Sequence, residues 1–79
     1  MSWHRSVVLS GLDVRVLRAT DPLDVRTVAR VAQRAGCAED VVRSSLGRLR
    51  RRMLVESHRG RPTGWLRTRD GDVVLEHQL

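Results

Sequence analysis

The chain has 79 residues and carries 15 basic against 9 acidic side chains, which gives a formal net charge of +6 at pH 7. A chain of this length forms a single domain, 1–79, with one small core, so a deep enzyme cleft beside that core is not expected. The positive charge favours polyanionic partners such as nucleic acid. Every basic residue is arginine, which fits bidentate contacts with phosphate or guanine and equally fits a GC-rich coding bias.

Residues that could carry metal or redox chemistry are few. Cys37 is the only cysteine, so neither a disulfide framework nor a zinc thiolate cluster is expected. His4, His58 and His77 lack the spacing of metal ligands. We therefore predict no catalytic residue, no metal site and no cofactor, and we interpret Cys37 as a small core residue rather than a redox switch.

The N-terminal stretch MSWHRSVVLSGLDVR has too short an apolar run for a signal peptide. No segment approaches the ~18 apolar residues of a membrane span. Together with the single cysteine, this predicts a cytoplasmic protein with no membrane partner, associated with the nucleoid if its partner is DNA. Residues 2–9 fit either a helix or a strand, and Trp3 stays unassigned.

A first helix is predicted in SGLDVRVLRATDP. Ser10, with Asp13 three residues later, resembles a capping box, and Pro22 ends the helical pattern. The apolar residues recur at helical spacing: Leu9, Leu12, Val16 and Ala19.

A second helix is predicted from an N-cap at Asp24 to about Ala35. Its expected buried face consists of Val25, Val28, Ala29 and Ala32. Gly36 closes the helix, and AGCA provides the short turn that leads into another helix at a steep angle. The pattern indicates a helix-turn-helix over about residues 24–53.

The third helix is predicted to begin near Glu39. Its core face consists of Val42, Leu46, Leu49 and Met53, which fall within an arc of about 60°. We interpret Glu39 and Asp40 as carboxylates that stabilise the helix N-terminus. The alternative is that one of them accepts a hydrogen bond from cytosine N4.

A β-hairpin, the wing, is predicted over about residues 54–68. LVESH and WLRT are the strands and RGRPTG is the turn, because β-branched and aromatic residues flank a Gly/Pro cluster. Trp65 is expected to be a core aromatic residue of the wing. Arg69 to Asp72 is predicted as a polar turn, after which VVLEHQL forms a short helix or strand.

Two stretches resemble bacterial regulators of the MarR-like and ArsR-like families. The run GCAEDVVRSSLGRLRRRMLV, residues 36–55, resembles their recognition-helix segment, and GRP followed by WLRT and Gly71 is similar to their wing. The resemblance covers residues 12–71. It implies a winged helix-turn-helix, an α+β but mainly α fold in which a three-helix core carries a C-terminal hairpin.

The sequence departs from those families at two positions. Met53 stands where they usually carry glycine at the turn from helix to strand, and Arg67 lies between Leu66 and Thr68. The chain also has no room for the long helices through which MarR-like proteins dimerise. Dimerisation is therefore not carried over, and a homodimer on palindromic sites stays open.

The outer face of the third helix carries the side chains expected to meet a DNA major groove. Its arginines can contact phosphates or bind guanine O6 and N7, its serine can donate or accept, and its glycine lets the backbone approach DNA. The alternative is a merely solvated helix face. The predicted DNA-binding residues here are Arg43, Ser44, Gly47, Arg48 and Arg51.

Further DNA contacts are predicted on either side of this helix. On the second helix, Arg26 and Arg30 begin an i, i+4, i+8 stripe, continued by Arg34, that could lie along the phosphate backbone. In the wing, Arg59, Gly60 and Arg61 precede a proline and resemble the core of an AT-hook, whose arginines follow the minor groove. The alternative for the wing tip is a solvated turn.

These features predict a sequence-specific double-stranded DNA-binding protein that is not an enzyme. The function expected is that of a small bacterial, phage or plasmid transcription regulator, such as a repressor that occupies its operator. One alternative is a winged-helix module that docks on a protein. Another alternative is binding of Z-form nucleic acid. It is ranked lower because the Asn and Tyr that such domains need are replaced by Arg43 and Gly47.

Overall fold

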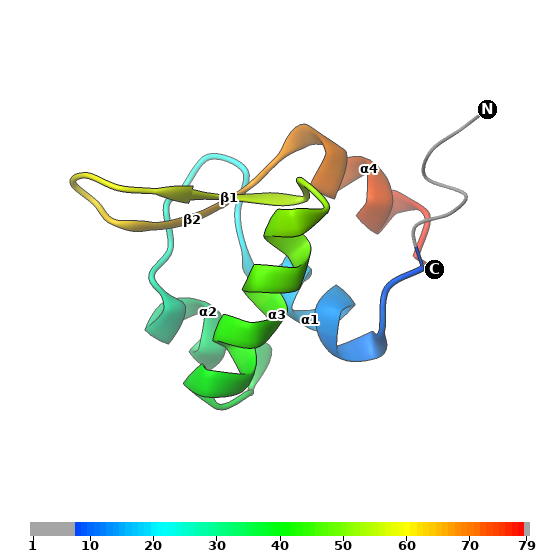
Figure 1. Cartoon of the computed structure of the whole chain (residues 1–79), viewed down its shortest axis with the longest axis horizontal. Helices are drawn as coiled ribbons and strands as arrows, with labels where there is room; N and C mark the ends of the chain where they lie inside the picture. Colours follow the sequence, from blue (N-terminus) through cyan, green and yellow to red (C-terminus); the bar gives the residue numbers. More distant parts are fainter. Residues whose placement is uncertain (1–7, 79) are drawn as a thin grey trace.

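Residues 8–78 form four helices and a two-stranded antiparallel hairpin, which confirms the predicted mainly helical α+β fold. The computed structural model describes residues 8–78 (Figure 1). Residues 2–9 were predicted as either a helix or a strand. Residues 8–10 are neither, and residues 2–7, Trp3 included, lie outside the described residues. In chain order the elements are α1 (Gly11–Ala19), α2 (Val28–Ala35), α3 (Glu39–Arg51), β1 (Val55–His58), β2 (Gly64–Arg67) and α4 (Arg69–Glu76).

The predicted cap of α1 is confirmed. Ser10 adopts an extended backbone, and its Oγ accepts a hydrogen bond from the Asp13 backbone N–H at 3.1 Å. This bond satisfies one of the free N–H groups at the start of the helix. Val16 and Leu17 are fully buried and fix α1 against α2 and α3.

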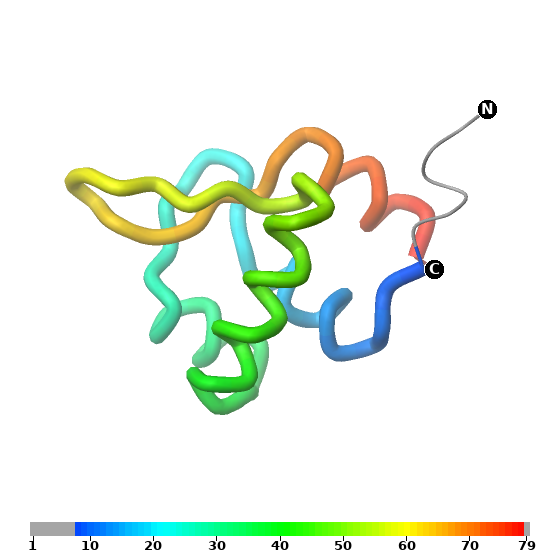
Figure 2. The backbone as a smooth tube through the Cα atoms, in the orientation of Figure 1, coloured from blue at the N-terminus to red at the C-terminus, as the bar shows by residue number. Residues whose placement is uncertain are grey.

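The predicted start of α2 is wrong by several residues. The N-cap is Thr27 rather than Asp24, and its hydroxyl accepts from the Arg30 N–H at 3.1 Å. The reason is tertiary: Arg26 pairs with Trp65 of β2, its N–H donating to the Trp65 carbonyl at 3.0 Å and its carbonyl accepting at 2.8 Å. This pairing holds segment 20–27, which links α1 to α2, beside the hairpin (Figure 2).

The buried face of α2 also differs from the predicted one. Val31 and Ala35 are buried together with Ala32, whereas Ala29 is exposed. The predicted face was phased from Val25, which lies before the helix. Counted from Val28 instead, the same i, i+3, i+4, i+7 spacing selects Val28, Val31, Ala32 and Ala35, which are the residues that pack in the core.

The core face of α3 is confirmed except at its end. Val42, Leu46 and Leu49 are fully buried, but Met53 is 71% exposed. Met53 lies beyond the helix and adopts φ 62°, a left-handed conformation that reverses the chain. Leu54 then takes the buried position that the periodicity assigned to Met53.

The hairpin pairs β1 with β2 in antiparallel register, with Val55 opposite Arg67 and Ser57 opposite Trp65. It extends away from the helices at one end of the molecule (Figure 1). Trp65 is half-buried and packs on the core, as predicted for an aromatic residue of the wing. Gly64 lies directly against the Arg26 carbonyl, so that any side chain there would collide with the backbone of segment 20–27.

The predicted polar turn after the hairpin is wrong, because α4 begins at Arg69. Thr68 caps this helix by accepting from the Gly71 N–H at 3.1 Å. Asp70 and Asp72 lie in its first turn, where carboxylates stabilise a helix N-terminus. The following segment, VVLEHQL, was predicted as either a helix or a strand. Its first four residues form the end of α4.

Arg67, the second departure from the regulator pattern, connects three parts of the fold. Its Nε donates to Asp72 Oδ1 at 2.6 Å, and its Nη1 donates to the carbonyls of Leu17 and Thr20, each at 3.1 Å. The side chain therefore ties β2 to the end of α1 and to α4. Among residues 8–78, no helix is both long and apolar enough to cross a bilayer.

Candidate nucleic-acid interface

The outward face of α3 is open and polar. The side chains of Arg43, Ser44 and Arg51 are exposed. Gly47 is half-buried, and a Cβ built on it would meet no atom within 4 Å. This part of the helix can therefore approach a flat or convex partner without obstruction. Arg51 has no hydrogen-bonding or ionic partner within residues 8–78.

Arg48 is placed differently from the other predicted arginines of α3. Its Nη2 and Nε donate to the Asp13 carboxylate at 2.8 and 3.2 Å. Ser45, fully buried on the same helix, donates to Asp13 Oδ1 at 2.6 Å. The guanidinium is thus tethered to α1, although its side chain keeps 45% exposure.

The Asp13 carboxylate is held in its charged form. Burial by itself would raise its pKa, but the hydrogen bonds from Arg48 and Ser45 and the nearby positive charge of Arg48 outweigh burial and lower the pKa below its ordinary value. The same hydrogen bond, followed by the charge of Asp13, raises the pKa of Arg48. Asp13 therefore fixes one arginine of α3 while remaining shielded from any partner that approaches the outer face.

Arg43 keeps most of its freedom. Its Nη2 lies 3.4 Å from Glu39 Oε1 one turn earlier, in a pair whose side chains are 62% and 51% exposed. An exposed i, i+4 pair contributes only about 0.3 to 0.5 kcal/mol, so a phosphate or base could displace it at little cost. Glu39 and Asp40 lie in the first turn of α3, as expected for carboxylates at a helix N-terminus.

The predicted arginine stripe on α2 does not form as a unit. Arg26 precedes the helix and is turned inward: it lies 3.5 Å from both Asp21 and Asp24 and donates to the Ala19 carbonyl at 2.9 Å, with 14% side-chain exposure. The helical placement of Arg26 was therefore wrong. Arg30 is exposed at the start of α2, while Arg34 is exposed and borders a separate hollow beside α1.

The wing tip presents its arginines to solvent. Arg59, Gly60 and Arg61 are all exposed, and within the described chain neither arginine has a hydrogen-bonding or ionic partner. The loop is closed instead by its own polar groups. His58 Nδ1 donates to the Pro62 carbonyl at 2.8 Å, and the Thr63 hydroxyl donates to the Gly60 carbonyl at 2.6 Å.

A residue that the sequence analysis missed joins the two arginine-rich regions. Arg50 is exposed on α3 and borders a hollow of about 440 Å³ between the start of α2 and the wing, together with Arg59, Thr27 and Trp65. The signal was present in the sequence, because Arg43 and Arg50 are seven residues apart and so share one side of a helix. The side of α3 that faces the wing is therefore more basic than predicted.

Within residues 8–78, no three His, Cys, Asp or Glu side chains are grouped closely enough to hold a metal ion. Cys37 is half-buried, packs against the core and donates to the Ala35 carbonyl at 3.5 Å. The polar groups available on the outer face of α3 and on the wing tip are arginine guanidinium groups, the Ser44 hydroxyl and the backbone at Gly47. Such groups recognise phosphates and base edges.

A solved structure repeats this arrangement of helices and hairpin. The crystal structure of ZitR from Lactococcus lactis, a zinc-responsive MarR family member, is similar with a TM-score of 0.75 and 23% sequence identity. The chain has a winged helix-turn-helix fold. The match covers 90% of this chain and 51% of ZitR, so the winged-helix domain spans about half the length of that protein.

The resemblance to MarR-like regulators is thus confirmed for the fold. Sequence comparisons add nothing to it, since no protein-family profile matches the chain and no curated protein matches it significantly. In the winged-helix domain α2 and α3 form the helix-turn-helix, Gly36 with φ 68° supplies its turn, and β1 and β2 form the wing. Zinc responsiveness is a property of ZitR.

Proposed function

We propose that this winged-helix domain binds double-stranded DNA sequence-specifically and acts as a small transcription regulator of bacterial, phage or plasmid genes. The observation that carries the proposal is that Arg50 of α3 and Arg59 of the wing border one hollow. Four exposed arginines of α3 and the wing have no carboxylate partner in residues 8–78: Arg50, Arg51, Arg59 and Arg61.

In the proposed complex, α3 enters the major groove. Arg43 and Arg51 are free to bind guanine O6 and N7, and Ser44 can donate to or accept from a base. Gly47 permits close approach of the helix backbone. Arg48 serves as a phosphate contact rather than a base reader, because Asp13 already occupies two of its donors.

The hollow between the start of α2 and the wing is the proposed path of the sugar-phosphate backbone. Arg50 and Arg59 border it from two sides, and the N-terminus of α2 lies at a third, where helix N–H groups favour a negative charge. Arg30 extends this contact along α2. The wing tip, with Arg59 and Arg61, then reaches the flanking minor groove.

Selection of bound duplexes from a random pool, followed by fluorescence anisotropy titration of the selected sites, tests the proposal. A conserved consensus is expected, with affinity that falls steeply as salt rises because phosphate contacts release counterions. A palindromic consensus would indicate binding as a homodimer. If no duplex outcompetes bulk DNA and the affinity is indifferent to salt, the proposal is wrong, and co-purification of an acidic protein would favour a protein-docking role.

A further inference from the structure

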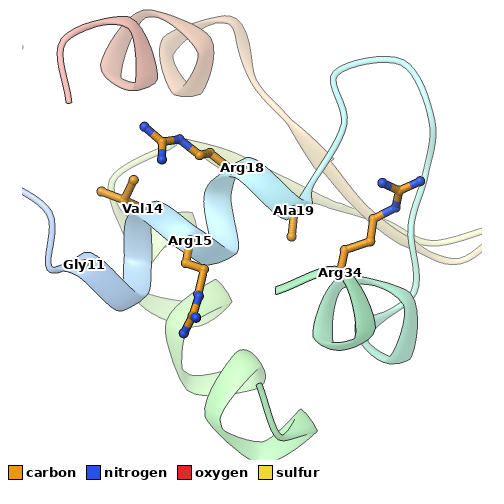
Figure 3. Close-up of a pocket in the computed structure, with 6 residues that line it drawn as sticks. All are labelled: Gly11, Val14, Arg15, Arg18, Ala19 and Arg34. Carbon is orange, nitrogen blue, oxygen red and sulfur yellow. The ribbon is translucent and has the colours of Figure 1, made fainter. Parts of the chain in front are cut away.

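A second basic hollow lies on the outer side of α1, between this helix and α2. Its volume is about 410 Å³, within the range of ~300 to 1,000 Å³ typical of small-ligand pockets. None of its lining residues belongs to α3 or to the wing, so the proposed DNA-binding surface does not use it. The lining residues are Gly11, Val14, Arg15, Arg18, Ala19 and Arg34 (Figure 3).

The three arginines of this hollow are not neutralised. The lining contains no acidic side chain, and Arg15, Arg18 and Arg34 make no ion pair with any residue from 8 to 78. Asp13, the nearest acid along α1, already accepts from Ser45 and Arg48. Residues 1–7 contain no aspartate or glutamate. The hollow therefore carries an uncompensated positive charge.

The arrangement of the guanidinium groups restricts the shape of a ligand. Figure 3 shows Arg15 and Arg18 pointing away from α1 in different directions, while Arg34 extends from α2. The three arginines line the hollow, and their guanidinium groups do not converge on one point (Figure 3), which suits an anion with several charged groups along its length.

The chemistry of the lining restricts the ligand further. Arginine forks pair with phosphate oxygens in bidentate fashion. The lining has no aromatic side chain on which a base could stack. We propose that this hollow binds a linear polyphosphate chain, recognised through its phosphate groups alone. The chain could belong to inorganic polyphosphate or to the tail of a nucleoside triphosphate.

Isothermal titration calorimetry of the full chain with sodium tripolyphosphate, at a constant ionic strength near physiological, tests this proposal. Saturable binding at one site is expected. Arg15→Gln, Arg18→Gln and Arg34→Gln combined should weaken it by more than about tenfold, since each charge-assisted hydrogen bond removed is worth about a factor of ten or more. The variant should melt nearly like the unaltered protein, because these exposed side chains make no hydrogen bond or ion pair within residues 8–78.

The matched control combines Arg51→Gln, Arg59→Gln and Arg61→Gln, which removes the same charge from α3 and the wing. It should keep most of the tripolyphosphate affinity and lose DNA affinity instead. Gly11→Leu leaves the net charge unchanged and projects into open space, so it should fold and weaken tripolyphosphate binding by obstructing the hollow. Equal loss in both triple variants, or full affinity in Gly11→Leu, would show only general electrostatic attraction and overturn the proposal.

Two further ligands separate the sources of the anion. A nucleoside triphosphate that binds no more tightly than tripolyphosphate indicates an inorganic chain, whereas a tighter nucleotide whose binding is lost in the same triple variant indicates the nucleotide tail. A poly-glutamate peptide that matches tripolyphosphate in affinity and in dependence on these arginines would assign the hollow to acidic protein segments and overturn the phosphate proposal. Since α3 and the wing take no part, failure here leaves the DNA-binding proposal intact.

Discussion

Asp13 on α1 holds Arg48 on α3 through two hydrogen bonds, from Nη2 at 2.8 Å and from Nε at 3.2 Å. The two residues are 35 positions apart in the chain, so this contact fixes the proposed recognition helix to the rest of the core. It also divides the arginines of α3 into one that is tethered and others that are free to meet a partner.

Removing the Asp13 charge should destabilise the domain. Asp13→Asn weakens the bonds to Arg48 and disturbs the buried Ser45 hydroxyl, and we expect a loss of about 1 to 3 kcal/mol in the free energy of unfolding. The half-exposed position of Arg48 keeps the loss below that of a fully buried ion pair. Urea denaturation at neutral pH measures it. Asp40→Asn, an exposed carboxylate on α3, should change the free energy of unfolding far less.

The same carboxylate should make stability depend on pH. The pKa of Asp13 is lowered in the folded protein, so its contribution is complete above the unfolded value of about 3.9 and is lost as the pH falls through the folded pKa. The difference in unfolding free energy between the unaltered protein and Asp13→Asn should therefore shrink as the pH is lowered from neutral through the unfolded value and then through the lower folded pKa. A difference that stays constant over this range would mean that Asp13 acts through shape alone.

A glycine at position 53 should stabilise the fold. Met53 adopts φ 62° with a 71% exposed side chain, and a left-handed backbone costs a non-glycine residue roughly 1 to 2 kcal/mol. Met53→Gly should recover about 1 kcal/mol of this, because glycine loses more backbone entropy on folding. Arg52→Gly, at the neighbouring residue with φ −94°, should instead destabilise. Thermal melting of the two variants in opposite directions is the expected result.

The first three helices and the hairpin could be predicted because their signals are local. Ser10 caps α1, the spacing of Val42, Leu46 and Leu49 marks the buried side of α3, and a Gly/Pro cluster marks the turn of the wing. The start of α4 was missed although its Thr68 cap is local, whereas the start of α2 depends on a distant residue. The pairing of Arg26 with Trp65 delays α2, and no periodicity along the chain contains that information.

The positions of the arginines around α3 could be predicted from their spacing, but their ion pairs could not. The spacing placed Arg43, Arg51 and Arg48 on or beside the outer face of α3, as the structure does. It could not show that Arg48 is bound by Asp13 from another helix, or that Arg26 is turned inward to Asp21. Such ion pairs depend on how helices cross, which the sequence of each helix alone does not determine.

Replacing Arg43 by Ala should test base recognition by α3. If Arg43 binds a guanine in bidentate fashion, the variant should lose about 1 to 3 kcal/mol of binding free energy and relax preference at one base position. Arg48→Ala should weaken binding evenly across sequences, because its tether favours a phosphate contact. Anisotropy titrations of both variants against the consensus and its single-base substitutions distinguish these roles, and an even loss for Arg43→Ala would make that residue a phosphate contact too.

The wing provides the last prediction. Arg59 and Arg61 are exposed, and neither has a partner among the residues described, so changing both to Ala should leave thermal melting nearly unchanged. DNA binding should weaken, and the plot of log K against log salt should flatten by up to about 0.9 for each phosphate that the variant no longer neutralises. If the two side chains enter the minor groove, the loss should be larger on sites with A·T-rich flanks, whose narrow groove attracts arginine.

The matched control for the wing variant is Arg15→Ala with Arg18→Ala, since it removes the same charge from α1. Equal affinities of the wing variant and the unaltered protein at low and moderate salt would reduce the wing tip to a solvated turn. A loss equal to that of the α1 control on every flank would reduce its role to net charge.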